Sequence, residues 1–357
     1  EMTPTVARMV AQIHREAAKP LRWYAIPNLM RYEKPQRGRL REHWQFNCDI
    51  FGAPEGLGEI EILQVVTGLL RSFGANDEHF EVLLNDRRVV DAVFKRLLNL
   101  EPEQALKLYK VIDKAKKVSA EALDKMTAEI ISQEAVRAHF KEYLALNSFP
   151  ALVSFLERHG LKDAAGGFMI FIENLASAGL QKYVIYDPTI VRGLDYYTGV
   201  VFEIFDKNPE NRRAICGGGA YANLLQIFNE DPLPGVGFGL GDVTLADFLR
   251  THGLLPEFPK PSIDLLVAAM EPSCTTKAQE LAQELRHHCV KTELYLGDAK
   301  LKKVFQHSER RGHRAVVFIG SNELTNGQAE FKRQTDQQKQ TFKLDDLKGI
   351  QSFVKEN

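Results

Sequence analysis

Arginines and glycines are the residues of this chain whose types and spacing are best suited to chemistry. The sequence contains neither a G-x-x-x-x-G-K-[ST] phosphate loop nor a G-x-S-x-G nucleophile elbow. If the protein handles phosphates, arginines must bind them, because a guanidinium can pair with phosphate through two parallel hydrogen bonds. The candidates are Arg31, Arg192 and the arginines of the segment 33–39.

The string RGLDYYTG, from Arg192 to Gly199, is the most specific pattern in the sequence. An arginine beside a glycine is followed by two tyrosines, Tyr196 and Tyr197, which run directly into an alternating strand pattern at 200–205. An active-site role explains this combination. A purely structural explanation is also open, because tyrosine is favoured in strands.

Glycines are concentrated at 217–219 and at the alternating positions 235, 237, 239 and 241. A dinucleotide-binding fingerprint requires G-x-G-x-x-G, whereas here G-x-G-x-G is followed by Asp242. Glycine allows a ligand or another strand to approach the backbone closely. We therefore expect a glycine-rich strand beneath a planar ligand, followed by a helix over 243–250.

Metal-binding, disulfide and membrane functions find little support in the sequence. The ten histidines include no H-E-x-x-H motif, and the cluster of His287, His288 and Cys289 is typical of solvated side chains, so no residue is assigned as a metal ligand. The four cysteines are scattered, which suits a reducing cytoplasm. The longest apolar runs are far shorter than the ~18 residues that a membrane helix needs.

Positive charge is concentrated in one segment, although the chain is nearly neutral with 46 Lys and Arg against 47 Asp and Glu. Between Lys19 and Arg41 there are seven basic residues and one acid, Glu33, which gives a local charge of +6. The segment reads as strand, basic loop, strand, with aromatic-rich strands over 22–30 and 42–51. A solvated hairpin tip would look similar, but so one-sided a charge favours an anion-binding surface.

The remaining patterns indicate an α+β core, a helical insertion and a terminal α/β domain. Apolar residues recur at helical spacing over 59–73, a short strand follows at 80–84, and 86–161 is almost wholly helical in pattern. A helix over 168–178 precedes the glycine-rich strands, and 263–319 alternates strand and helix as in a largely parallel sheet. The expected domains are 1–85 and 166–255 for the two parts of the core, 86–165 for the insertion and 261–357 for the terminal domain.

Two longer segments resemble a known family. Residues 191–203 (VRGLDYYTGVVFE) resemble the histidine-specific signature of histidyl-tRNA synthetases, and 29–52 (LMRYEKPQRGRLREHWQFNCDIFG) resembles their motif 2 with its Arg-x-Glu core. Residues 1–5 resemble the Glu-x-Thr that precedes motif 2, and 216–240 resembles the glycine-rich approach to motif 3. The resemblance covers roughly residues 1–250, and the terminal domain has the place and size of the family's anticodon-binding domain.

The resemblance implies a class II synthetase fold, with an antiparallel catalytic sheet flanked by helices, a helical insertion and a C-terminal α/β anticodon-binding domain. It implies that ATP, with Mg²⁺, converts histidine into histidyl-adenylate, and that histidine is then transferred to tRNA(His). It also implies a cytoplasmic homodimer without a membrane contact. Because motif 1 would precede Glu1, we expect these residues to be part of a longer enzyme.

The resemblance also implies roles for individual residues. Arg31 would hold the ATP α-phosphate, Glu33 would bind the adenine amino group, and Arg192 would lie on the other side of the α-phosphate. These two arginines are the expected catalytic residues, since they would stabilise developing negative charge without a protein nucleophile. The remaining expected contacts are Gly239 and Gly241 for ATP, Glu1, Thr3 and Gln45 for the α-ammonium group of histidine, Asp49 and Tyr197 for its imidazole nitrogens, Arg192 and Tyr196 beside them, and Gln36 and Arg41 for the tRNA acceptor end.

The chain departs from the family pattern at two places. Gly241 is followed by Asp242-Val243-Thr244, so the arginine that most class II enzymes place in motif 3 is absent. Ala220 and Ala222 stand where the family usually has the arginine and aspartate of Gly-Gly-Gly-Arg-Tyr-Asp. These departures keep open a catalytically silent paralogue, such as the regulatory subunit of ATP phosphoribosyltransferase or an RNA-sensing module. The intact string at 192–197 and the anticodon-type domain favour the enzyme.

Overall fold

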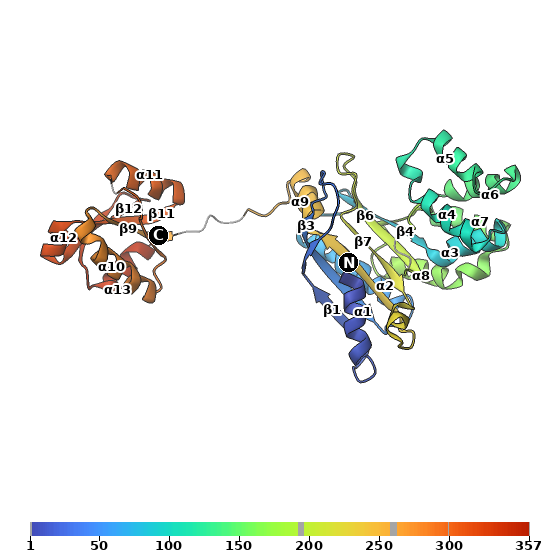
Figure 1. Cartoon of the computed structure of the whole chain (residues 1–357), viewed down its shortest axis with the longest axis horizontal. Coiled ribbons are helices and arrows are strands. Elements are labelled where there is room, and N and C mark those ends of the chain that lie inside the picture. Colours follow the sequence, from blue (N-terminus) through green and yellow to red (C-terminus); the bar gives the residue numbers. More distant parts are fainter. Residues whose placement is uncertain (1, 192–195, 258–262, 299, 357) are drawn as a thin grey trace. The chain divides into compact units, whose positions relative to one another are not determined.

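The chain forms two units, Glu1–Pro256 and Glu257–Asn357, each with its own core (Figure 1). The computed structural model describes residues 2–191, 196–257, 263–298 and 300–356. Within these ranges no helix has both the length and the apolar character that a bilayer span requires.

An eight-stranded sheet forms the centre of the first unit. Its order is β1-β3-β8-β7-β6-β4-β5, and β2 pairs with the first residues of β3, 42–44. All pairs are antiparallel except β4 with β5. The expected antiparallel sheet is therefore confirmed. The strands are β1 (Leu21–Ala25), β2 (Asn28–Met30), β3 (Glu42–Phe51), β4 (Phe80–Asp86), β5 (Val184–Tyr186), β6 (Val200–Asp206), β7 (Cys216–Tyr221) and β8 (Gly235–Gly241).

Helices pack on both faces of this sheet. Alternation along β3 directs Ile50 toward the main core, which includes α2 (Leu57–Ser72) and α9 (Asp242–Thr251). The neighbouring Phe51 points to the other face, where it joins a cluster with α1 (Met2–Ile13) and the 3₁₀ turn η4 (Leu224–Phe228). The expected helix over 59–73 is observed as α2. No helix was expected over 2–13, although the buried residues Thr3, Val6, Ala7 and Val10 of α1 recur at helical spacing and proline is tolerated in a first helical turn.

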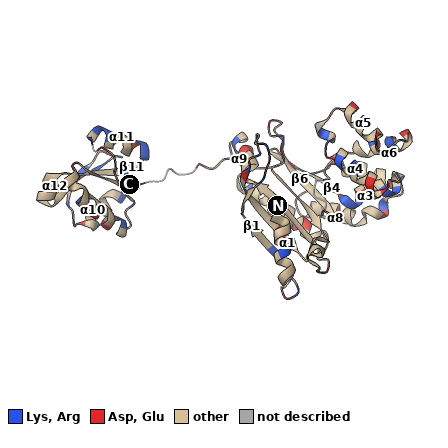
Figure 2. Cartoon of the chain, viewed as in Figure 1, with Lys and Arg blue, Asp and Glu red and all other residues tan. Residues whose placement is uncertain are grey.

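Helices fill the segment between β4 and β5, as the Gly-poor pattern predicts (Figure 1). Local caps start several of them: Asp86 accepts a hydrogen bond from the Arg88 amide at 2.8 Å, and Ser119 and Ser148 cap two others. Figure 2 shows charges of both signs on these helices, whereas the sheet is mostly uncharged. The elements are α3 (Arg87–Ala92), η1 (Val93–Leu97), α4 (Pro102–Ile112), η2 (Ala115–Lys117), α5 (Ala120–Ala128), α6 (Glu134–Leu144), α7 (Phe149–Arg158), η3 (Lys162–Ala165) and α8 (Gly166–Ser177).

The second unit has a five-stranded sheet in the order β10-β9-β11-β12-β13. The first three strands are parallel, as expected, but β12 and β13 add an antiparallel hairpin that was not expected. The hairpin escapes sequence reasoning because β13 buries only Phe342. The elements are β9 (Ile263–Ala269), η5 (Pro272–Cys274), α10 (Thr275–His287), β10 (Thr292–Leu294), α11 (Leu301–Arg311), β11 (His313–Ile319), α12 (Ser321–Asn326), β12 (Gln328–Arg333), β13 (Lys339–Lys343) and α13 (Leu347–Lys355).

Candidate active site

Glycines of β7 and β8 form a floor on one face of the first sheet, and β3 lies next to β8. The strand register places Gln45 of β3 opposite Gly241, and Gly239 opposite Gly217 of β7. A β-carbon on Gly239 would lie only 2.2 Å from Nε2 of Gln45, far inside van der Waals contact. Glycine is therefore required here if Gln45 is to keep its place above the floor.

A cavity of about 750 Å³ lies over this floor, a volume within the usual range of small-molecule sites. Four residues expected to bind substrates line it: Arg31, Gln45, Gly239 and Gly241. Arg39, one of the loop arginines expected to bind phosphate, also lines the cavity. The cavity further contains charged residues for which the sequence suggested no specific role: Arg212, Arg213, Asp113, Lys116, Glu203 and Asp242. Of these, Asp113 and Lys116 come from the helical segment between β4 and β5, which therefore contributes to the cavity wall.

Arg31 is held at the cavity wall by the backbone of the basic loop. Its Nε donates to the carbonyl oxygen of Leu40 at 2.9 Å, and its amide donates to the carbonyl oxygen of Arg41 at 2.8 Å. Partial burial and the nearby Arg39 and Arg213 lower the pKa of Arg31, against an opposing effect of Glu33. The positive charges of these guanidinium groups repel one another, and an anion that binds between them relieves this repulsion.

The other residues expected from the basic loop lie outside the large cavity. Glu33 forms an ion pair with Arg39, with 2.6 Å between Oε2 and Nε. The guanidinium of Arg41 lies 5.4 Å from the centre of the Tyr32 ring, and its Nε donates to the Glu33 carbonyl oxygen at 3.0 Å. Gln36 lines a neighbouring cavity of about 510 Å³, which contains residues of the β6–β7 connection. Gln36 and Arg41 are thus exposed on the surface around the site.

Asp49 is buried farther along β3, where the Tyr221 hydroxyl donates a 2.5 Å hydrogen bond to its Oδ1. Burial, followed by the Asp49 charge, raises the pKa of Tyr221 well above its ordinary value, so this phenol keeps its proton and can donate. Its ring centre is 5.7 Å from that of Tyr196, which is 4.7 Å from that of Tyr197. Thr3 is buried on α1, whose apolar side chains pack in the same cluster as Tyr197.

The structure therefore separates the expected histidine-binding residues into two groups. Gln45 faces the large cavity, whereas Asp49 lines a smaller one of about 300 Å³ together with Met2 and Trp23. Asp49 and Gln45 are four residues apart on one strand, so both side chains project from the same face. Tyr221, which pairs with Asp49, received no role from the sequence, although its position directly after the glycines of β7 was a signal.

Asn47 lies between Gln45 and Asp49 on the same face of β3 and is a further residue that sequence reasoning missed. Its side chain is buried, with 2 % of its surface exposed. Among the residues that the structure describes, none donates a hydrogen bond to its Oδ1. An unsatisfied buried carbonyl costs free energy, on the order of 1–3 kcal/mol.

Thr244 and Arg213 line the cavity near Gly241, after which the sequence shows no motif 3 arginine. Thr244, three residues after Gly241, donates within the fold to the Ile215 carbonyl oxygen at 3.1 Å. Arg213 lines the same cavity, and its Nε donates to the Arg37 carbonyl oxygen at 3.1 Å. The β6–β7 connection therefore brings a guanidinium to the cavity, whereas Arg250 of α9 is not among the residues that line it.

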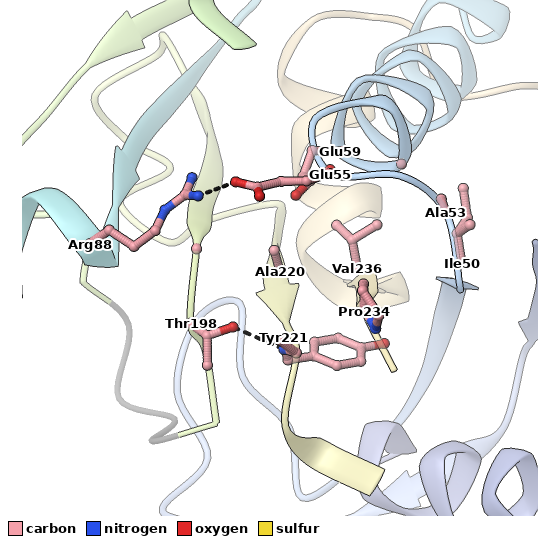
Figure 3. A pocket seen from close by; sticks show the side chains of 14 residues that line it. Ile50, Ala53, Glu55, Glu59, Arg88, Thr198, Ala220, Tyr221, Pro234 and Val236 are labelled. Atoms are coloured by element: carbon pink, nitrogen blue, oxygen red, sulfur yellow. Dashed lines mark hydrogen bonds and ion pairs between the residues drawn. The ribbon is translucent and has the colours of Figure 1, made fainter. Parts of the chain in front are cut away.

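A second cavity, of about 250 Å³, lies near the start of α2 (Figure 3). Ala220 and Ala222 line it together with Glu59, and Ala220 packs against the main core. Glu59 accepts a hydrogen bond from the Gly56 amide at 2.8 Å, and burial raises its pKa. The two alanines that depart from the family pattern thus border this second cavity and do not line the one over the glycine floor.

Glu1 and Arg192 lie outside the described residues, together with 193–195 from the same string. Their expected roles in binding the histidine ammonium group and the α-phosphate rest on the resemblance.

Family models match the chain in the same two parts. Residues 1–243 match the model described as histidyl-tRNA synthetase, and residues 264–352 match an anticodon-binding domain. A histidine–tRNA ligase of Leptospira biflexa is 37 % identical over 343 residues, which cover 96 % of this chain and 78 % of that protein. The chloroplastic/mitochondrial histidine–tRNA ligase of Arabidopsis thaliana is 31 % identical, over 97 % of this chain and 70 % of its own length.

Solved structures share the fold at lower identity. The histidyl-tRNA synthetase of Nostoc sp. PCC 7120 superposes with a TM-score of 0.69 at 21 % identity, covering 99 % of this chain and 83 % of that one. A Bacillus halodurans protein described as ATP phosphoribosyltransferase regulatory subunit/histidyl-tRNA synthetase gives 0.68 at 21 % identity, covering 90 % of this chain and 79 % of that one. The class II architecture is thereby established for the fold.

Proposed function

Because this chain belongs to the histidyl-tRNA synthetase family, we propose that it is a histidine–tRNA ligase that uses the cavity over the glycine floor as its active site. The enzyme forms histidyl-adenylate from histidine and ATP and then transfers the histidyl group to tRNA(His). The observation that carries this proposal is that Arg31 and Gln45, from the segment 29–52, line one cavity with Gly239 from the distant strand β8.

Adenylate formation requires positioning and charge stabilisation more than a reactive side chain. A carboxylate oxygen of histidine attacks the α-phosphorus, the bond to the bridging oxygen breaks, and pyrophosphate leaves with that electron pair. Arg31 would stabilise the charge on the α-phosphate from one side, and we assign Arg192 to the other side from the resemblance. Glu33 and Arg39 form an ion pair in this structure. When Glu33 accepts a hydrogen bond from the adenine amino group, Arg39 would become free to bind the phosphates.

Arg213 is our candidate for the positive charge that motif 3 does not supply. It lines the cavity beside Thr244, and its charge is close enough to lower the pKa of Arg31. A flexible guanidinium at this position could reach the β- or γ-phosphate while Arg31 holds the α-phosphate. Arg212 lines the same wall and could assist.

Histidine recognition would use the polar row on β3. Gln45, with Thr3 and Glu1, would bind the α-ammonium group, while Asp49 and Tyr197 would meet the two imidazole nitrogens. Tyr196 would support the ring of Tyr197, against which it packs. An acid paired with a hydroxyl suits a ring with two polar nitrogens, and analogues without them would leave buried groups unpaired.

Mg²⁺ is the usual companion of ATP, and the cavity offers suitable ligands for it. Glu203 and Asp242 supply carboxylates to the same space as Arg31, and hard oxygen atoms are the ligands that Mg²⁺ prefers. When bound, the ion would neutralise phosphate charge. Carboxylates and arginines in one cavity thus suit a magnesium–nucleotide complex better than a free anion.

Recognition of tRNA(His) would involve both units. Gln36 and Arg41, on the exposed basic loop, are our candidates for contact with the acceptor end. In the second unit Arg286, Lys291 and Arg311 border an open groove beside β10, and such cations would attract the phosphates of the anticodon arm. We further propose a cytoplasmic homodimer, supported by exposed apolar side chains along β1–β3: Tyr24, Met30, Tyr32 and Trp44.

A silent regulatory paralogue is the second candidate, and the Bacillus halodurans neighbour carries both descriptions. Charging of tRNA(His) with labelled histidine separates the two functions. We expect charging by the wild-type protein and a loss of at least 100-fold in kcat/KM for Arg31→Ala, whereas Arg41→Ala should mainly raise the KM for tRNA. Histidine binding without any charging would favour the regulatory paralogue.

A further inference from the structure

Three potential metal ligands meet on the helical hairpin α6–α7, in a part of the chain that the proposed reaction does not use. His139 and Glu142 are one helical turn apart on α6, and His159 directly follows α7. Nε2 of His159 is 3.1 Å from Oε2 of Glu142, and Nδ1 of His139 is 4.0 Å from the same oxygen. One ligand atom from each of the three residues fits within 4.8 Å.

These distances are close to those of a coordination sphere. Two ligand atoms at ~2.0–2.1 Å from a tetrahedral zinc ion are separated by roughly 3.3 Å, so small side-chain rotations would bring all three atoms to one ion. His159 is the most fixed of the three, with 14 % of its side chain exposed and its ring 4.5 Å from that of Phe155. His139 is 43 % exposed and Glu142 38 % exposed, which leaves a side open to solvent.

Arg158 holds the Glu142 carboxylate through the oxygen that does not face the histidines. Its Nη2 donates to Oε1 of Glu142 at 2.6 Å, which leaves Oε2 directed toward the two histidines. Ligating carboxylates are commonly held by such an outer partner, which also sets their orientation.

We propose that His139, Glu142 and His159 form a binding site for a divalent transition-metal ion of the zinc type, with a solvent molecule as the fourth ligand. Two imidazoles and one carboxylate suit zinc, whereas Mg²⁺ prefers oxygen ligands and near-octahedral geometry. The ion would link the C-terminal end of α7 to α6 and stabilise the hairpin. The Arg158 charge lies beside it and would limit the affinity.

The test is zinc binding to the purified, chelator-treated protein, measured by titration with ZnCl₂. We expect the wild-type protein to bind one more equivalent of zinc than His139→Gln, which removes a ligand from a partly exposed position. His287→Gln changes a histidine at the end of α10, in the other unit, and should bind as the wild type does. A tenfold excess of MgCl₂ should not displace the zinc.

A second readout is thermal unfolding in the presence and absence of ZnCl₂. Zinc should raise the midpoint of the wild type and of His287→Gln, because a ligand that binds only the folded state stabilises it. The midpoint of His139→Gln should not rise. Equal zinc stoichiometry in wild type and His139→Gln, or no zinc bound by the wild type, would overturn the proposal.

Discussion

Tyr221→Phe removes the hydroxyl that donates to Asp49 and leaves the ring in place. The hydrogen bond is 2.5 Å long, is buried, and has a carboxylate as its acceptor. Hydrogen bonds to charged groups contribute about 1.5–3 kcal/mol, so the carboxylate loses that much stabilisation. If Asp49 orients the imidazole of histidine, the variant should bind histidine roughly 10- to 150-fold more weakly, at 1.4 kcal/mol for each factor of ten.

The assay for this prediction is histidine-dependent exchange of pyrophosphate into ATP, with histidine and ATP varied separately. The KM for histidine should rise by that factor, whereas the KM for ATP should stay within about twofold. Tyr186→Phe is a matched control, because its hydroxyl is also buried but contacts Tyr143 in the main core, with 3.3 Å between the oxygens. A histidine KM that is unchanged in Tyr221→Phe, or that rises equally in Tyr186→Phe, would refute the reasoning.

Three further substitutions probe the glycine floor, the phosphate end of the cavity and the start of α2. Gly239→Ala should displace the flexible end of Gln45 and raise the histidine KM at least tenfold, with an unchanged far-ultraviolet circular dichroism spectrum. Arg213→Ala should lower kcat/KM for ATP by ~10- to 100-fold in pyrophosphate exchange, and an unchanged value would exclude it as the substitute for the motif 3 arginine. Burial raises the pKa of Glu59, so the folded state disfavours its charge and wild-type stability should fall as the pH rises from the unfolded pKa near 4.5 through the higher folded pKa. Glu59→Gln can still accept the Gly56 hydrogen bond but should lack this fall in urea unfolding measured across that pH range.

Much of the fold could be predicted from local pattern. The apolar spacing over 59–73 identifies α2, and the absence of glycine between 86 and 159 identifies the helices between β4 and β5. The hairpin β12–β13 could not be found in this way, because β13 alternates weakly and exposes most of its side chains. Strands of this kind are defined by their partners in the sheet more than by their own sequence.

The candidate site was predictable where one motif carries several of its residues. Gln45 and Asp49 share β3, and the two-residue alternation of a strand is enough to place both side chains on one face. The contacts of Arg213 and Tyr221 join segments more than 100 residues apart, and no local spacing reports such pairs. The cluster around Glu142 likewise depends on how α6 packs against the end of α7.

Activation of histidine in the cavity over the glycine floor can be measured by amino-acid-dependent pyrophosphate exchange. The purified protein, incubated with ATP, Mg²⁺, labelled pyrophosphate and each of the twenty amino acids in turn, should form labelled ATP with histidine alone. Arg31→Ala should reduce that signal at least 100-fold. Exchange that is absent with histidine, or equal in wild type and Arg31→Ala, would contradict the assignment of this cavity as the active site.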